Sequence, residues 1–137
     1  MSAQEIEALK KSKADPAWTA KIDATLMLMK KYPKTGIRAN DWVRIILLCR
    51  MGYAVGYLTE AEALNRGLEA AKQIQSSCDS WNDMVENYML GRDFMYGDMF
   101  ENAESLAYRK NCYAKAQRLL SDKRRPMVKL SFKGTKL

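Results

Sequence analysis

The stretch Asp41-Trp-Val-Arg-Ile-Ile-Leu-Leu-Cys-Arg-Met-Gly-Tyr53 carries apolar side chains on nearly every face of a helix. Asn40 or Asp41 offers a capping side chain at its start. A helix that is apolar almost all round is typical of the centre of a core. We therefore expect this helix to lie in the middle of the molecule, with the other elements packed around it.

Sequence patterns on both sides of this stretch predict further helices. Asp15-Pro16 is a helix start, and Thr59-Glu-Ala-Glu62 is a capping box in which the Thr hydroxyl and the Glu carboxylate each bond a backbone amide. Apolar residues at helical spacing then predict helices over residues 4–13, 16–32, 60–75, 81–95 and 102–120. The inward side chains of the last of these helices are expected to be Leu106, Tyr113, Ala116 and Leu120.

The end of the chain has a different period. Val128, Leu130 and Phe132 alternate with polar residues, which is a strand pattern. Because the chain offers no second strand, this segment either lies as an extended arm over the helices or pairs with the sheet edge of a partner. The sequence thus predicts an all-α fold, a single compact domain of five to six helices over residues 1–122, with an extended basic C-terminal arm over residues 123–137.

Charge is concentrated in that arm. The 137 residues contain 23 Lys and Arg against 16 Asp and Glu, a net charge of +7. The last 15 residues contain no acid and six cations, which leaves a net charge of +1 for the body of the chain. The six cations are Lys123, Arg124, Arg125, Lys129, Lys133 and Lys136. Such a tail can bind an acidic protein face or phosphates, or it can be a solvated chain end.

The residue types that are missing exclude several classes of protein. The chain has no histidine, which removes Ser-His-Asp and Cys-His nucleophiles and most catalytic zinc sites. Its three cysteines are odd in number and widely spaced, so we expect reduced thiols and no disulfide framework. The acidic start is unlike a signal peptide, and the longest apolar run is far shorter than the roughly 20 residues that cross a bilayer. A cytoplasmic location without membrane contact is the expectation.

Between residues 40 and 94 the sequence resembles a known family. The matching motifs are Asp41-Trp-Val-Arg44, Arg50-Met-Gly-Tyr53, Gly56-Tyr-Leu-Thr-Glu-Ala-Glu-Ala63, Ser80-Trp81 and Tyr88-Met-Leu-Gly-Arg92-Asp-Phe94. They are similar to the bacterial domain-of-unknown-function family numbered 1266, typified by the YbeU and YbeR proteins of enteric bacteria. The resemblance covers a little over a third of the chain and implies a mostly helical cytoplasmic domain. It implies no reaction.

The polar residues of these motifs have two interpretations. An arginine on an apolar helix needs a carboxylate when it is buried, because an unpaired buried charge is strongly unfavourable. We therefore expect a structural polar network among Asp41, Arg44, Arg50, Glu62, Arg92 and Asp93. The alternative is that Arg44, Arg50 and Arg92 converge on a pocket for a phosphate or carboxylate.

The cysteines do not indicate catalysis. Cys49 lies in the most apolar run, where a thiol behaves as a small hydrophobe. Cys78 lies in a polar loop and is expected to be the most exposed, but no histidine is present to activate it. No glycine-rich phosphate loop, metal-ligand cluster or carboxylate pair stands out. We expect no catalytic residue, no cofactor and no metal.

The favoured function is therefore binding of another protein. Its most concrete form is a bacterial immunity protein whose basic arm covers the acidic active-site cleft of a cognate toxin. The first alternative is a nucleic-acid-binding protein that acts through the same arm. The second alternative is a binder of a small anionic ligand that uses the arginines.

Overall fold

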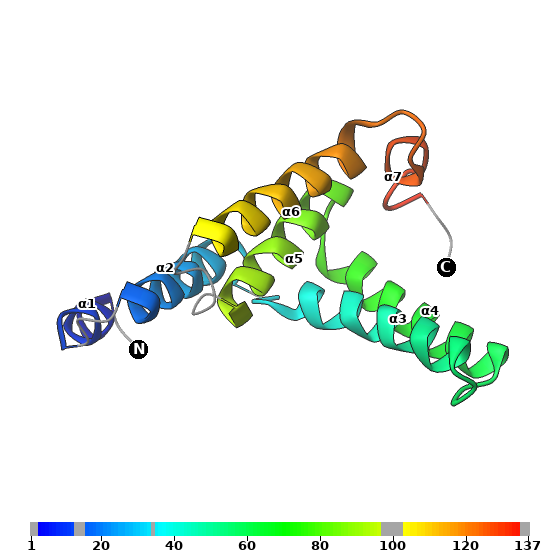
Figure 1. Cartoon of the computed structure of the whole chain (residues 1–137), viewed down its shortest axis with the longest axis horizontal. Coiled ribbons are helices and arrows are strands. Elements are labelled where there is room, and N and C mark those ends of the chain that lie inside the picture. Colours follow the sequence, from blue (N-terminus) through cyan, green and yellow to red (C-terminus); the bar gives the residue numbers. More distant parts are fainter. Residues whose placement is uncertain (1–2, 13–15, 34, 97–102, 135–137) are drawn as a thin grey trace.

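The computed structural model describes residues 3–12, 16–33, 35–96 and 103–134, and in these residues every regular element is a helix. The prediction of an all-α fold is confirmed (Figure 1). Within the described part of the chain, no helix is both long and apolar enough to cross a membrane. The elements are α1 (Ala3–Ser12), α2 (Pro16–Lys31), α3 (Arg38–Ala54), α4 (Glu60–Ser77), α5 (Trp81–Tyr96), α6 (Ala103–Ser121) and α7 (Pro126–Lys129).

Helices α3 and α4 form an antiparallel hairpin. Gly56 has a φ of +80°, which suits glycine, and the amides of Tyr57 and Leu58 both donate to the Gly52 carbonyl to close the end of α3. Thr59 then starts α4 with the predicted capping box, in which its side chain accepts from the Glu62 amide and the Glu62 carboxylate accepts from the Thr59 amide. Local sequence alone therefore determines this turn.

Helix α5 is the element around which the others pack. Helices α2, α3 and α6 all contact it. The hydrophobic core lies where α3, α4, α5, α6 and the C-terminal segment meet, and its buried members are Ala39, Ile74, Cys78, Met84, Val85, Met89, Ala116 and Phe132. The prediction that Cys78 is the most exposed thiol is wrong, because only 1% of its surface is accessible, and this burial raises its pKa to about 11.

The prediction that α3 lies in the centre of the core is also wrong. Its first half packs on α5, but its second half extends beyond α5 with α4 beside it (Figure 1). Leu47, Leu48, Met51 and Val55 are consequently exposed, with 62% of Leu48 accessible. An apolar pattern predicts that a helix face is buried, but it does not specify whether the residues that bury it belong to the same chain.

The start of α3 also differs from expectation. The helix begins at Arg38, and no side chain caps it. The side-chain amide of Asn40 donates instead to the Tyr88 carbonyl of α5, 3.1 Å away, and the side-chain amide of Asn87 donates to the Gly36 carbonyl at 2.7 Å. Both asparagines are buried. They join the α2–α3 connection and the start of α3 to the middle of α5.

Gly91 provides a direct test of this α3–α5 contact. A Cβ at position 91 would lie 2.7 Å from the Asn40 Cβ, so Gly91→Ala forces the helices apart. We expect a loss of about 1–3 kcal/mol in the free energy of unfolding, measured by denaturant titration followed by circular dichroism.

Gly67→Ala is the matched control, because a Cβ there meets no atom within 4 Å. In dilute solution the free energy of unfolding of this variant should rise by about 0.5–1 kcal/mol, because alanine is a better helix former than glycine. Equal stability of the two variants would contradict a close contact at Gly91.

Candidate protein-binding surface

The C-terminal segment forms a short helix followed by a turn where a strand was predicted. Residues Pro126–Lys129 form the short helix α7, with Pro126 in its first turn and Arg125 in an extended conformation before it. Proline suits the first turn of a helix because its φ is already helical and its missing amide is not needed there. The alternation of three apolar residues is too short to outweigh this signal, so the strand prediction is wrong for this segment. The segment lies over the helices, as one of the two predicted arrangements has it, but as a short helix and a turn and not as an extended arm.

Two aromatic side chains anchor the segment. The Phe132 ring is buried and meets the Trp81 ring edge to face, with centroids 4.9 Å apart. The Trp81 indole NH donates to the Leu130 carbonyl at 2.8 Å, and the Gln75 amide donates to the Phe132 carbonyl at 2.7 Å. These contacts attach the end of the chain to the junction of α4 and α5.

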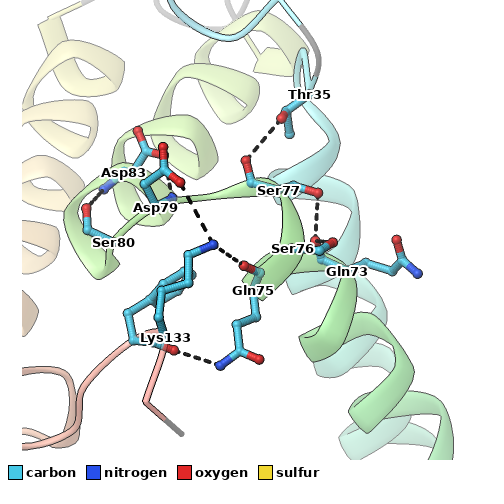
Figure 2. Close-up of polar contacts among 10 residues, drawn as sticks. Thr35, Gln73, Gln75, Ser76, Ser77, Asp79, Ser80, Asp83 and Lys133 are labelled. Atoms are coloured by element: carbon cyan, nitrogen blue, oxygen red, sulfur yellow. Dashed lines mark hydrogen bonds and ion pairs between the residues drawn. The ribbon is translucent and has the colours of Figure 1, made fainter. Parts of the chain in front are cut away.

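Lys133 adds a polar contact at the same junction (Figure 2). Its Nζ donates to the Gln75 carbonyl at 2.6 Å and lies 3.8 Å from the Asp79 carboxylate. The turn before α5 is itself fixed, because Ser80 accepts from the Asp83 amide and Asp83 accepts from the Asp79 amide. The start of α5 therefore provides a rigid platform for the C-terminal segment.

Five of the six predicted partner-binding cations lie in the described part of this segment and are exposed: Lys123, Arg124, Arg125, Lys129 and Lys133. The sixth, Lys136, lies outside the described residues. Val128 and Leu130 are exposed among them. We call these seven exposed side chains the C-terminal surface. It is both basic and apolar, and its backbone is held in place by the buried Phe132.

Asp122 moderates the charge at one end of the C-terminal surface. Its carboxylate accepts two hydrogen bonds of 3.0 Å from the Arg124 guanidinium and lies 3.7 Å from Arg125. The bonds from Arg124 lower the pKa of Asp122. Arg124 and Arg125 are thus partly neutralised, whereas Lys123 and Lys129 make no ion pair with another described residue.

The expected network of six polar residues does not form as a unit. Asp41, Arg44 and Arg50 are exposed and make no ion pair within the described residues, and Glu62 is occupied by the capping box. Arg50 lines a groove between α3 and α4, whereas Arg92 lies 5.0 Å from the centre of the Tyr108 ring, between α5 and α6. The network prediction fails because Asp41, Arg44 and Arg50 all face water, where an arginine needs no partner.

Asp93 is buried, as expected of a network member, but its partners are on α6. Its Oδ2 accepts from the Arg109 guanidinium and from the Tyr113 hydroxyl, the latter at 2.7 Å. The hydrogen bond from Arg109 to Asp93 raises the pKa of the guanidinium. Sequence reasoning missed Arg109, because nothing in the pattern of α6 distinguishes it from the other basic residues. This cluster joins α5 to α6.

The inward face predicted for α6 is partly correct. Ala116 is buried, and Tyr113 and Leu120 pack on the core, but Leu106 is exposed. Cys112, on the same helix, is half-buried and carries a free thiol, as Cys49 and Cys78 do. In the described ranges, no three Cys, Asp or Glu side chains gather as metal ligands would.

Comparison with known proteins gives one match. The family model described as "Protein of unknown function (DUF1266)" matches residues 2–132, which is nearly the whole chain. Neither a curated protein nor a solved structure matches the chain.

Removing the aromatic anchor should release the C-terminal segment. Phe132→Ala deletes the ring that packs on Trp81, and a buried Phe-to-Ala change costs about 3–5 kcal/mol. The segment should then open at least about a hundredfold more often, and trypsin should cleave after Lys129 and Lys133 correspondingly faster. Limited proteolysis with mass spectrometry measures the rate. Leu130→Ala, which changes an exposed side chain, is the control and should be cleaved at the original rate.

The α5–α6 cluster predicts a loss of stability at high pH. Burial, and then the hydrogen bond to Asp93, raises the pKa of Tyr113 from about 10 to about 12. The folded protein thus holds this proton more tightly than the unfolded chain does. Its contribution is complete below about pH 10 and is lost as the pH rises towards about 12. Urea titrations across this range should show a falling free energy of unfolding, with a shallower fall in Tyr113→Phe. An unchanged slope in the variant would contradict the assignment.

Proposed function

This chain belongs to the DUF1266 family of proteins of unknown function, and we propose that it is a protein-binding module without catalysis of its own, which uses the C-terminal surface to contact an acidic partner. The observation that carries the proposal is the anchored basic segment. Phe132 is buried, yet the cations around it are exposed. The partner is another protein and no membrane is involved.

The anchored segment favours binding in two ways: less backbone entropy is lost on binding, and its exposed charges raise the rate of association. A free tail loses backbone entropy of about 1–2 kcal/mol per residue when it binds, whereas the segment around Phe132 is already ordered. Exposed lysines such as Lys123 and Lys129 attract an acidic surface over distances of about 8–10 Å at moderate salt. Such attraction mainly speeds association and selects partners of opposite charge.

The mixture of side chains favours a protein over a nucleic acid. Val128 and Leu130 are exposed between the cations, and apolar contacts of this kind suit a protein interface. A phosphate-binding surface would instead be expected to present its arginines free, but Arg124 and Arg125 share the Asp122 carboxylate. Nucleic-acid binding is therefore the alternative that the experiment below tests. No described contact favours the small-anion alternative.

The finer form of the proposal is an immunity protein of a bacterium, related to YbeU and YbeR and located in the cytoplasm. In this form the C-terminal surface docks over the acidic active-site cleft of a cognate toxin and blocks access of its substrate. The family match supports the family alone. The exposed cations support an acidic partner.

Affinity capture with charge-reversal variants tests the protein-binding proposal. The bait is the full chain, and the lysate comes from the organism that encodes it. The variant Lys123→Glu/Lys129→Glu reverses two exposed charges that have no ion-pair partner among the described residues. It should lose a single acidic protein that the unaltered chain retains, because like charges then face each other. Quantitative mass spectrometry of the eluates measures the loss.

The control and the salt dependence separate the alternatives. Lys110→Glu reverses an exposed charge on α6 and should retain the partner. Capture of nucleic acid in its place, with binding that nuclease abolishes and that weakens by orders of magnitude between about 50 and 200 mM salt, would overturn the proposal. For the immunity form, co-expression of the chain should restore growth to cells that produce the captured protein, and the double variant should not.

A further inference from the structure

The outer half of the α3–α4 hairpin is an apolar surface that the described residues of this chain leave exposed. Between the two helices runs a groove of about 630 Å³, whose lining includes Ile46, Arg50, Tyr53, Leu64, Gly67 and Leu68. Tyr53, Leu64 and Leu68 are exposed, Leu64 by 64%. The neighbouring face of α3 adds Leu47, Leu48, Met51 and Val55. Exposed apolar patches of this kind mark an interaction site.

The shape of the groove suits another helix. Ala63, Gly67 and Ala71 succeed one another at four-residue spacing along α4 and line the groove with small side chains. A Cβ placed at Gly67 would meet no atom within 4 Å, so the space above this position is open. Leu64, one turn away, stands out of the same face. One helix face therefore presents both a hole and a projecting side chain, which is the geometry of interlocking helices.

The total surface matches what one subunit of a dimer exposes. A compact chain of 15.7 kDa is expected to have about 7,300 Å² of accessible surface, whereas this chain has 9,815 Å². The excess is about 2,500 Å². Obligate homodimers bury roughly 1,000–2,500 Å² on each subunit. The chain as a whole thus exposes enough surface for a stable contact between two copies, and the apolar hairpin is part of that surface.

The distribution of charge favours the hairpin as the contact between two copies. The whole chain carries +7, so two copies repel each other over most of their surfaces. The hairpin end is different, because residues 45–64 contain Arg50 against Glu60 and Glu62. These three side chains leave the hairpin end with a net charge of −1, so the like-charge repulsion between two copies is weakest there.

We propose that a second copy of this chain docks on the α3–α4 hairpin and forms a two-fold symmetric dimer. The two hairpins pack antiparallel, and Leu64 of each copy occupies the open space over Gly67 of the other. A two-fold contact uses the same patch twice, so the patch must complement itself, as the paired Leu64 and Gly67 do. This inference goes beyond the proposed function and concerns a different surface from Lys123 and Lys129.

The molecular mass in solution is the first test. Sedimentation equilibrium of the full chain at micromolar concentrations should give twice the mass of 15.7 kDa. Leu64→Glu places a charge in the contact and should weaken dimerisation by at least about thirtyfold. The side chain is exposed in the single copy, so the circular dichroism spectrum and the unfolding of the diluted protein should stay unchanged.

Gly67→Leu separates loss of the contact from loss of the fold. The new side chain fills the open space of the groove and should also produce a monomer. Leucine is a much better helix former than glycine, so the diluted variant should unfold at a higher temperature than the unaltered chain. A variant that is more stable yet monomeric cannot be explained by misfolding.

Leu106→Glu is the control, because it adds the same charge at an exposed position on α6 and should leave the dimer intact. A monomeric unaltered chain at about 100 µM would overturn the proposal, as would a dimer that tolerates both Leu64→Glu and Gly67→Leu. Capture of the acidic partner by Leu64→Glu tests the proposed function separately, since Lys123 and Lys129 are unchanged in that variant.

Discussion

The close contact between α3 and α5 is the constraint on which the rest of the structure depends. At Gly91 the two helices approach so closely that Asn40 leaves no room for a methyl group. Because this contact lies in the first turn of α3, α5 covers only the first half of that helix. The second half, together with the first half of α4, must extend beyond the core (Figure 1). A contact at one buried glycine thus determines which apolar residues of α3 meet water.

The same contact prepares the platform for the C-terminal segment. With α3 fixed at the middle of α5, the junction of α4 and α5 stays open on the side of Ile74, Trp81 and Met84. Phe132 and Met127 pack over this opening and line a remaining open pocket of about 300 Å³ with Val43 and Ile46. The basic end of the chain is therefore attached to the core by its apolar residues, and its lysines are left for solvent.

The features that local sequence determines were predictable. The capping box at Thr59 and Glu62 and the positions of the six longer helices follow from neighbouring residues, and the structure shows them. The partner of Asp93 was not predictable, because Arg109 is 16 residues away and resembles other basic residues of α6. The burial of Cys78 depends in the same way on where α5 and the C-terminal segment lie.

Several apolar side chains of α3 stay exposed in the single chain, and this exposure needs an explanation. A fully buried Leu or Met contributes about 1.5–3 kcal/mol to folding, but an exposed one contributes almost nothing and favours aggregation. Leu47, Leu48 and Met51 therefore do little for the stability of one copy, and Glu or Lys would form the helix equally well there. When a second hairpin buries these side chains, they contribute the favourable free energy of burial that they do not contribute in the isolated chain. The helix that sequence patterning assigns to a core thus belongs to a core that two chains complete.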